Sequence, residues 1–124
     1  MNKKEIIIQS TLVPYSQAVA FNGFMFISGQ IALNFETGEI INGSVEEQTR
    51  MVLENIKTVL KEKQLDLDSV IKTTIFVTDL NDYSVINTIY GEYFADEYPA
   101  RSCVQVSALP RGVNVEIECV AIYN

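Results

Sequence analysis

The sequence predicts an α+β fold in which about six strands form one mixed sheet and two helices cover one of its faces. Two observations lead to this prediction. Six segments are rich in β-branched and aromatic residues, and two longer segments repeat apolar residues at helical spacing. The chain has 124 residues, without an internal repeat or a linker, which is the length of one domain. We therefore expect a single domain over residues 1–124, with the element order βββαβαββ.

The segment 18–28 predicts a β-hairpin that follows a first strand at 5–10. The Asn-Gly pair at 22–23 is typical of a type I′ turn, because both central residues must accept a positive φ. The hairpin ends at Ser28-Gly29, where the glycine indicates a β-bulge or a close approach of another group.

Two helices are predicted from capping and apolar spacing. The first, at 45–63, begins with a capping box formed by Ser44 and Glu47. The second is capped by Asn81 or Asp82. Its apolar stripe consists of Val85, Ile86, Ile89, Tyr93 and Phe94.

The remaining strands are predicted at 70–79, 101–109 and 113–123. In the last of these, one face is apolar throughout, which suits packing under the helices. The opposite face begins with Glu116 and Glu118 but ends in apolar residues. An apolar patch on the free side of a sheet favours burial against another subunit, so we expect a homo-oligomer.

Composition excludes several classes of function. A net charge of −7 argues against nucleic acid as the main partner, because phosphate binding needs clustered Lys and Arg. No apolar stretch approaches the roughly 18 residues that span a bilayer, and the N-terminal residues do not resemble a signal peptide. With two cysteines, a reduced, cytoplasmic protein is the simplest interpretation.

The chain contains no histidine, so it lacks the commonest general base near neutral pH and the commonest metal ligand. Two cysteines alone do not complete a thiolate zinc site. Acid–base chemistry must therefore come from Glu, Asp, Tyr, Lys, Cys or water.

Arg101 and Cys103 share one face of a predicted strand. Arg101 is either a surface residue or a clamp whose planar guanidinium binds a carboxylate with two hydrogen bonds. Cys103 is either a nucleophile activated by the nearby cation or a small buried apolar residue. Its backbone groups can also serve a ligand, whatever the thiol does.

Other candidates are single residues with open alternatives. Glu116 or Glu118 is either part of an exposed acidic face or a partly buried base of raised pKa. Tyr15 presents its hydroxyl to a ligand or packs on a neighbour. Ser28 and Gly29 offer a hydroxyl and an uncrowded backbone N–H.

Seven blocks of the sequence resemble, in order, the reactive-intermediate deaminase family, also called the RidA or YjgF family. The resemblance runs from about residue 5 to the C-terminus, and its most specific part is PARSC followed by the VEIE strand. The blocks are VPYSQAV (13–19), FISGQI (26–31), TGEII (37–41), QTRMVLENI (48–56), IKTTIFVTDLNDY (71–83), YFADEYPARSCVQV (93–106) and VEIECVAI (115–122).

This resemblance implies a chorismate-mutase-like fold, assembled as a homotrimer with three sites in clefts between subunits. It also implies hydrolysis of 2-iminobutanoate and 2-iminopropanoate to 2-oxo acids and ammonia, with no cofactor and no metal. Carried over by position, Arg101 binds the substrate carboxylate and Glu116 activates water. The backbone of Cys103 contacts the imine end. The rest of the cleft is lined by Tyr15, Ser28, Gly29 and Asn87, with Tyr15 from the neighbouring subunit. Val13 stands where the family usually has glycine.

Two other classes of function stay open at this stage. A non-catalytic trimer can use the same cleft to sense a small acid, or the protein can act as a chaperone. A ribonuclease activity is the least favoured, because of the −7 charge and the missing histidines.

Overall fold

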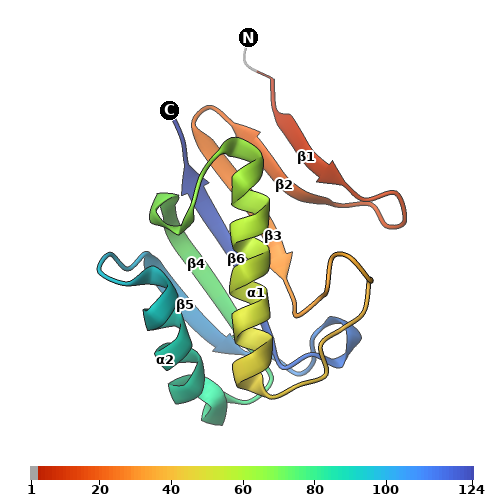
Figure 1. The fold of residues 1–124 in the computed structure, drawn as a ribbon, viewed down its shortest axis with the longest axis vertical. Helices are drawn as coiled ribbons and strands as arrows, with labels where there is room; N and C mark the ends of the chain where they lie inside the picture. Colours follow the sequence, from red (N-terminus) through yellow and green to blue (C-terminus); the bar gives the residue numbers. More distant parts are fainter. Residues whose placement is uncertain (1–2) are drawn as a thin grey trace.

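The computed structural model describes residues 3–124, which form a six-stranded sheet and two α-helices (Figure 1). The predicted α+β class and element order are confirmed. The strand order is β1-β2-β3-β6-β4-β5; β4 and β5 are parallel and the other neighbours are antiparallel. The elements are β1 (Glu5–Gln9), β2 (Ser16–Phe21), β3 (Phe24–Gln30), α1 (Val45–Leu60), β4 (Val70–Val77), α2 (Tyr83–Phe94), β5 (Ala100–Gln105) and β6 (Val115–Ile122).

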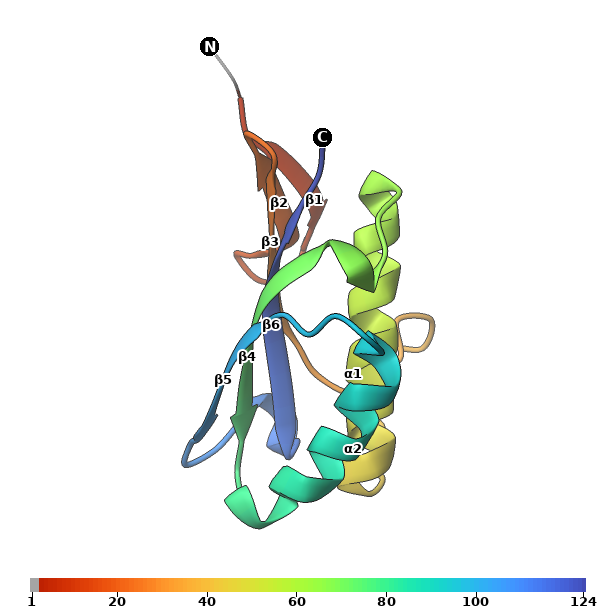
Figure 2. The same cartoon turned by 90° about the vertical axis from the view of Figure 1, so that its left-hand side faces the viewer.

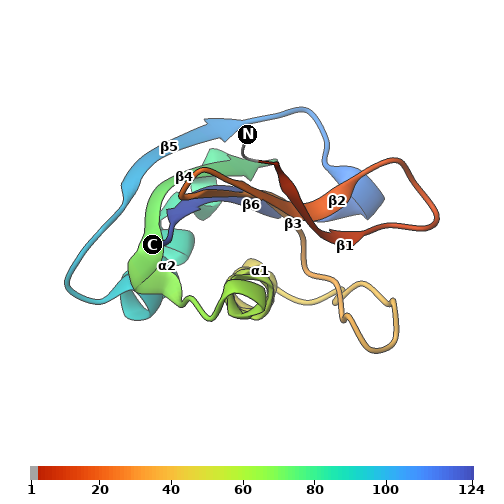
Figure 3. The same cartoon turned by 90° about the horizontal axis from the view of Figure 1, so that it is seen from above.

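Both helices lie on the same side of the sheet, and the other side is left uncovered (Figures 2 and 3). The core lies between the two layers, where Ile56 of α1, Ile75 of β4 and Ile117 of β6 are fully buried. Burying a side chain of this size contributes about 1.5–3 kcal/mol. Among residues 3–124, no helix is long and apolar enough to cross a membrane.

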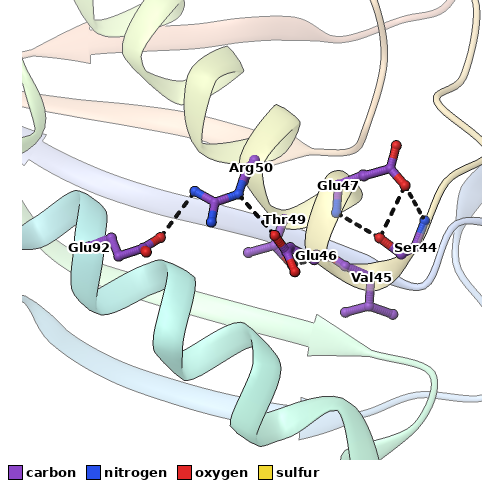
Figure 4. A network of polar contacts seen from close by, with 7 residues as sticks. All are labelled: Ser44, Val45, Glu46, Glu47, Thr49, Arg50 and Glu92. Carbon is purple, nitrogen blue, oxygen red and sulfur yellow. Dashed lines mark hydrogen bonds and ion pairs between the residues drawn. The ribbon is translucent and has the colours of Figure 1, made fainter.

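Local signals in the sequence form the predicted turn and cap. Asn22 and Gly23 have φ values of 53° and 88°, as a type I′ turn requires. Ser44 and Glu47 form the predicted capping box at the start of α1 (Figure 4). The same view shows Arg50 joining the two helices, since its guanidinium pairs with Glu92 of α2 at 3.0 Å.

The prediction for α2 needs two corrections. A short 3₁₀ turn at Leu80–Asp82 precedes the helix, and it is capped by the side chain of Asp79, which accepts a hydrogen bond from the N–H of Asn81 at 2.9 Å. Asp82 makes no capping hydrogen bond with its side chain. Val85 is 40 % exposed and lies outside the buried stripe.

Two predicted elements end three or more residues earlier in the structure. Helix α1 ends at Leu60, and residues 61–63 form a 3₁₀ turn. Strand β5 ends at Gln105 rather than at residue 109, because its partner β4 ends at Val77 and offers no further backbone to pair with.

Candidate functional site

Arg101 lies on the edge strand β5, on the helix-covered side of the sheet. It stands opposite Thr73 of β4, which is fully buried under the helices. Its Nη2 donates a hydrogen bond to the Tyr83 hydroxyl at 2.8 Å. Its Cζ lies 5.0 Å from the ring centroid of Tyr90. Within residues 3–124 no carboxylate pairs with Arg101, so its positive charge is available to an external anion.

Asn87 lies on the same face of α2 as the two tyrosines that hold Arg101, because positions 83, 87 and 90 fall on one side of a helix. Its Oδ1 is buried and has no hydrogen-bond partner among the described residues. A buried polar atom of this kind is costly unless a partner is supplied from elsewhere. Asn87 therefore joins Arg101 in one cluster, as a group with hydrogen-bonding capacity to spare.

Cys103 lies two residues further along β5, opposite Ile75, and packs at the margin of the core. Burial raises the pKa of its thiol, and the charge of Arg101 only partly opposes this effect. A protonated thiol is a poor nucleophile. The geometry thus favours the apolar interpretation of the Cys103 side chain over the nucleophilic one.

Glu116 lies on β6, on the uncovered side of the sheet, beside a β-bulge in β3. The register between β3 and β6 shifts between Ile27 and Gln30, as the glycine in this segment predicts. A Cβ added at Gly29 would lie 2.7 Å from Cδ of Glu116, which is closer than real contacts of this kind. The absence of a Cβ at Gly29 therefore leaves the space in which the carboxylate lies against the backbone of β3.

The electrostatic surroundings of Glu116 make it a candidate base. Burial raises the pKa of its carboxyl group, and the neighbouring charge of Glu118 raises it further. No hydrogen bond or ion pair to the Glu116 carboxylate is found within residues 3–124. A half-buried carboxylate without a partner holds a proton more readily near neutral pH than an ordinary one.

Tyr15, Gly29 and Glu116 line one cavity of about 550 Å³. Gln17 donates a hydrogen bond to the Tyr15 hydroxyl at 3.2 Å, and its own carbonyl accepts one from Gln30 at 2.8 Å. The other lining residues are Ser10, Leu12, Val13, Gln17, Gln30, Ile31, Leu33, Phe35, Pro110 and Arg111. Most of the wall is apolar, which excludes water from a bound molecule and strengthens electrostatic contacts inside.

Ser28 is next to Gly29 in sequence, but its side chain serves a different place. Its hydroxyl donates a hydrogen bond to the carbonyl of Ser16 at 2.6 Å. Ser28 also lines a smaller cavity, of about 300 Å³, together with Lys72 and Glu118. The structure therefore gives the Ser28 hydroxyl a role in joining β2 to β3.

The predicted residues form two clusters that do not meet within one chain. Arg101 stands opposite Thr73, and Thr73 stands opposite Cys119 of β6. Glu116 is three positions along β6 from Cys119 and points to the other face. With strands about 4.8 Å apart and about 3.3 Å per residue, the two backbones are separated by about 10 Å across the sheet and about 10 Å along it. The clusters are Arg101, Cys103 and Asn87 on one side, and Tyr15, Gly29 and Glu116 on the other.

Sequence reasoning missed the partners of these residues. Tyr83 and Tyr90, which contact Arg101, were visible only as aromatic residues spaced seven apart on one predicted helix. That spacing places them on one face, but nothing in it shows which strand they meet.

The two clusters define a small α+β protein. Within residues 3–124 it has an arginine without an ion pair on one sheet face and a carboxylate of raised pKa without an ion pair on the other. The sequence profile of the family described as "Endoribonuclease L-PSP" matches residues 7–123. "Reactive Intermediate Deaminase A, chloroplastic" of Arabidopsis thaliana is 46 % identical over 123 residues, covering 96 % of this chain and 66 % of that protein. The chain belongs to this family, that of the RidA/YjgF proteins.

Two further similarities concern chemistry and shape. The human protein named 2-iminobutanoate/2-iminopropanoate deaminase is 43 % identical over 109 residues, covering 88 % of this chain and 80 % of that protein. The crystal structure of Escherichia coli TdcF with bound serine superposes with a TM-score of 0.89 at 40 % identity, covering 97 % of this chain and 99 % of that chain. The sheet and helices described above are thus the fold of this family.

Proposed function

We propose that this protein is a 2-iminobutanoate/2-iminopropanoate deaminase, a single domain over residues 1–124 that hydrolyses reactive 2-imino acids to 2-oxo acids and ammonia. The observation that carries this proposal is the pair of complementary unpaired groups. In the part of the chain that the structure describes, Arg101 has no carboxylate partner and the half-buried carboxylate of Glu116 has no cationic partner. Relatives named as deaminases support the same reaction.

We further propose that the site forms between two chains of a homotrimer. Arg101, Asn87 and the backbone of Cys103 come from one subunit, and Tyr15, Gly29 and Glu116 come from its neighbour. The separation of these clusters within one chain supports this arrangement, because no side chain spans such a distance. The uncovered sheet face supports it too, since it exposes an apolar group that another subunit would bury. Exposed apolar residues on this face include Phe24, Phe26, Val104 and Ile122.

The reaction follows from what these groups can supply. Arg101 holds the substrate carboxylate with two charge-assisted hydrogen bonds. Glu116 orients a water molecule and takes its proton as the water oxygen bonds to the iminium carbon, which gives a neutral carbinolamine. Glu116 then returns the proton to nitrogen, the C–N bond breaks, and ammonia leaves as the hydroxyl oxygen forms the ketone. The hydroxyl proton passes to ammonia, so the products are a 2-oxo acid anion and ammonium.

The same proposal has no role for a cofactor or metal ion, and it places the protein in the cytoplasm with a small-molecule substrate. Cys103 and Cys119 are free thiols, which supports a reducing compartment. Cleavage of RNA is not part of the proposal, because the net charge of −7 opposes a polyanion.

The first experiment couples the purified protein to a threonine dehydratase and follows 2-oxobutanoate. Wild type accelerates its appearance, whereas Arg101→Ala and Glu116→Gln do not. If wild type gives no acceleration but binds 2-oxobutanoate through Arg101, the protein is a small-acid-binding regulator instead. Light scattering should give a mass near three times the 13.9 kDa of the chain, and a stable monomer would contradict the shared site.

A second experiment asks whether one site uses two chains. Arg101→Ala and Glu116→Gln subunits are co-expressed with different tags, and mixed trimers are isolated. If the two halves come from different subunits, about one site in three of each mixed trimer regains both groups, and about a third of wild-type activity returns. If both groups act from one chain, mixed trimers stay inactive.

A further inference from the structure

We propose that Tyr83, Tyr90 and Thr73 position the guanidinium of Arg101 for a carboxylate ligand. This inference rests on the function proposed above and assigns three residues to the carboxylate-binding half of that site. Tyr83 and Tyr90 are referred to below as the aromatic bracket. These are positioning residues, because each acts through Arg101 rather than on the substrate.

The aromatic bracket holds Arg101 from two directions. The Tyr83 hydroxyl accepts a hydrogen bond from Nη2 at 2.8 Å, and the Tyr83 ring centroid lies 5.4 Å from Cζ. The Tyr90 ring centroid lies 5.0 Å from the same carbon. Both rings are within the distance at which a cation is attracted to an aromatic face. Arg101 therefore has a preferred orientation although it stands on an edge strand.

Thr73 fixes the second ring of the bracket. Its Oγ1 and the Tyr90 hydroxyl share a buried hydrogen bond of 2.7 Å. Thr73 is fully buried and stands opposite Arg101 in the β4–β5 ladder. Arg101 and Thr73 are therefore neighbours on adjacent strands, and Thr73 holds the Tyr90 ring that packs against the Arg101 guanidinium.

The bracket orients Arg101 without neutralising it. Burial raises the pKa of Tyr90, so its phenol stays uncharged at neutral pH. A carboxylate in the same place would occupy the guanidinium fork and compete with the substrate. Neutral aromatic side chains leave both the positive charge and part of the fork free. Because the guanidinium is already ordered, a ligand loses less side-chain freedom on binding.

The test uses Tyr83→Phe and Thr73→Val, with Tyr98→Phe as the matched control because Tyr98 is 66 % exposed. Each of the first two variants should raise KM about three- to tenfold while kcat stays within about twofold, since the carboxylate is bound equally in the ground and transition states. Tyr98→Phe should change neither value. In an Arg101→Lys background the effect of Tyr83→Phe should disappear, because the residue it acts through is gone.

A direct measurement separates this inference from the proposed function. The Nε–H signal of Arg101 in ligand-free protein should show a high NMR order parameter that falls in Tyr83→Phe. An ordered guanidinium in a wild type without turnover would refute the deaminase and leave the positioning intact. The inference would be overturned if both variants left the mobility of the Arg101 guanidinium and the KM of the enzyme unchanged. An equal increase in KM from Tyr83→Phe in the wild-type and Arg101→Lys backgrounds would overturn it too, because it would indicate a structural role for Tyr83.

Discussion

Two arginines of this chain lie in contrasting surroundings. Arg50 stands in the seam between α1 and α2, where its guanidinium pairs with Glu92 at 3.0 Å and with Glu46 at 3.5 Å (Figure 4). Arg101 stands on β5 and contacts two tyrosines, with no carboxylate partner in the described part of the chain. The charge of Arg50 is paired with carboxylates of the same chain. The guanidinium of Arg101 is oriented by two tyrosines, and its charge stays available to a ligand.

The same contrast separates two glutamates. Glu92 is exposed and paired with Arg50. Glu116 is partly buried, and Gly29 leaves the space in which its carboxylate lies. Holding an unpaired charge in a sheltered place destabilises a fold, and such groups are concentrated at functional sites. Of these four residues, the two in the helix seam pair with each other, and the two on the sheet have no ion pair within residues 3–124.

Replacing each arginine by alanine is the most direct test of the difference between Arg101 and Arg50. Arg101→Ala should lose the two hydrogen bonds proposed to the substrate carboxylate, worth about 1.5–3 kcal/mol each. The expected fall in kcat/KM is about 10²- to 10⁴-fold in the coupled deamination assay. Arg50→Ala should leave kcat/KM within about twofold, because an exposed helix pair contributes little. Equal losses in both variants would remove the distinction between the two arginines.

Supplying Arg101 with its own carboxylate should make it resemble Arg50. In Tyr83→Glu the new side chain stands at the first turn of α2, where a negative charge is tolerated. We expect an internal ion pair, an unchanged or higher melting temperature, and binding of 2-oxobutanoate weakened about 10-fold to 100-fold in calorimetry. Retained affinity would show that the charge of Arg101 does not need to stay unpaired.

We expect Gly29 to be needed for the space that it leaves to the Glu116 side chain, more than for its backbone conformation. Gly29→Ala places a methyl group against Cδ of Glu116, which must then move away from β3. Because the contact is with the end of a flexible side chain, the free energy of unfolding should fall by no more than about 1 kcal/mol. The displaced carboxylate should lower kcat/KM by about tenfold to 10²-fold in the deamination assay. Gly91, inside α2, is the matched control because a Cβ there meets nothing within 4 Å. Gly91→Ala should raise stability by about 0.5–1 kcal/mol in urea denaturation. An unchanged kcat/KM in Gly29→Ala would contradict a need for this space.

The smallest effect is a pH dependence that arises at Glu116. Its folded pKa lies above the ordinary 4.5, so the folded protein binds this proton more tightly than the unfolded chain does. The stabilisation is complete below the unfolded pKa and is lost as the pH rises through the folded pKa. Glu116→Gln should therefore stabilise the protein more at pH 7 than at pH 4, measured by denaturant unfolding. A gain that is the same at both pH values would exclude a raised pKa.

Much of the fold could be predicted because its signals are local. The turn at Asn22-Gly23 and the capping box of Ser44 and Glu47 involve residues within four positions of one another. The alternation in β6 follows from the period of a strand. Where the prediction was wrong, as at the cap of α2, a competing short-range interaction had formed instead, with Asp79 capping an extra 3₁₀ turn.

The candidate site was predictable as a set of residue types, and less so as a geometry. The isolated signals at Arg101 and Glu116 could not show that β4 lies between their strands. The partners of Arg101 come from α2 and β4, far from β5 in sequence, and no local pattern indicates such contacts.

The helices and strands, their apolar faces, the lack of histidine and the residues available for chemistry all follow from the amino-acid sequence, because each depends on composition or on near neighbours. Which of these residues come into contact depends on how the elements pack. Strand order and helix placement depend on the joint burial of distant apolar faces. That packing put Arg101 and Glu116 on opposite faces of one sheet, with the first held by tyrosines and the second accommodated by a glycine.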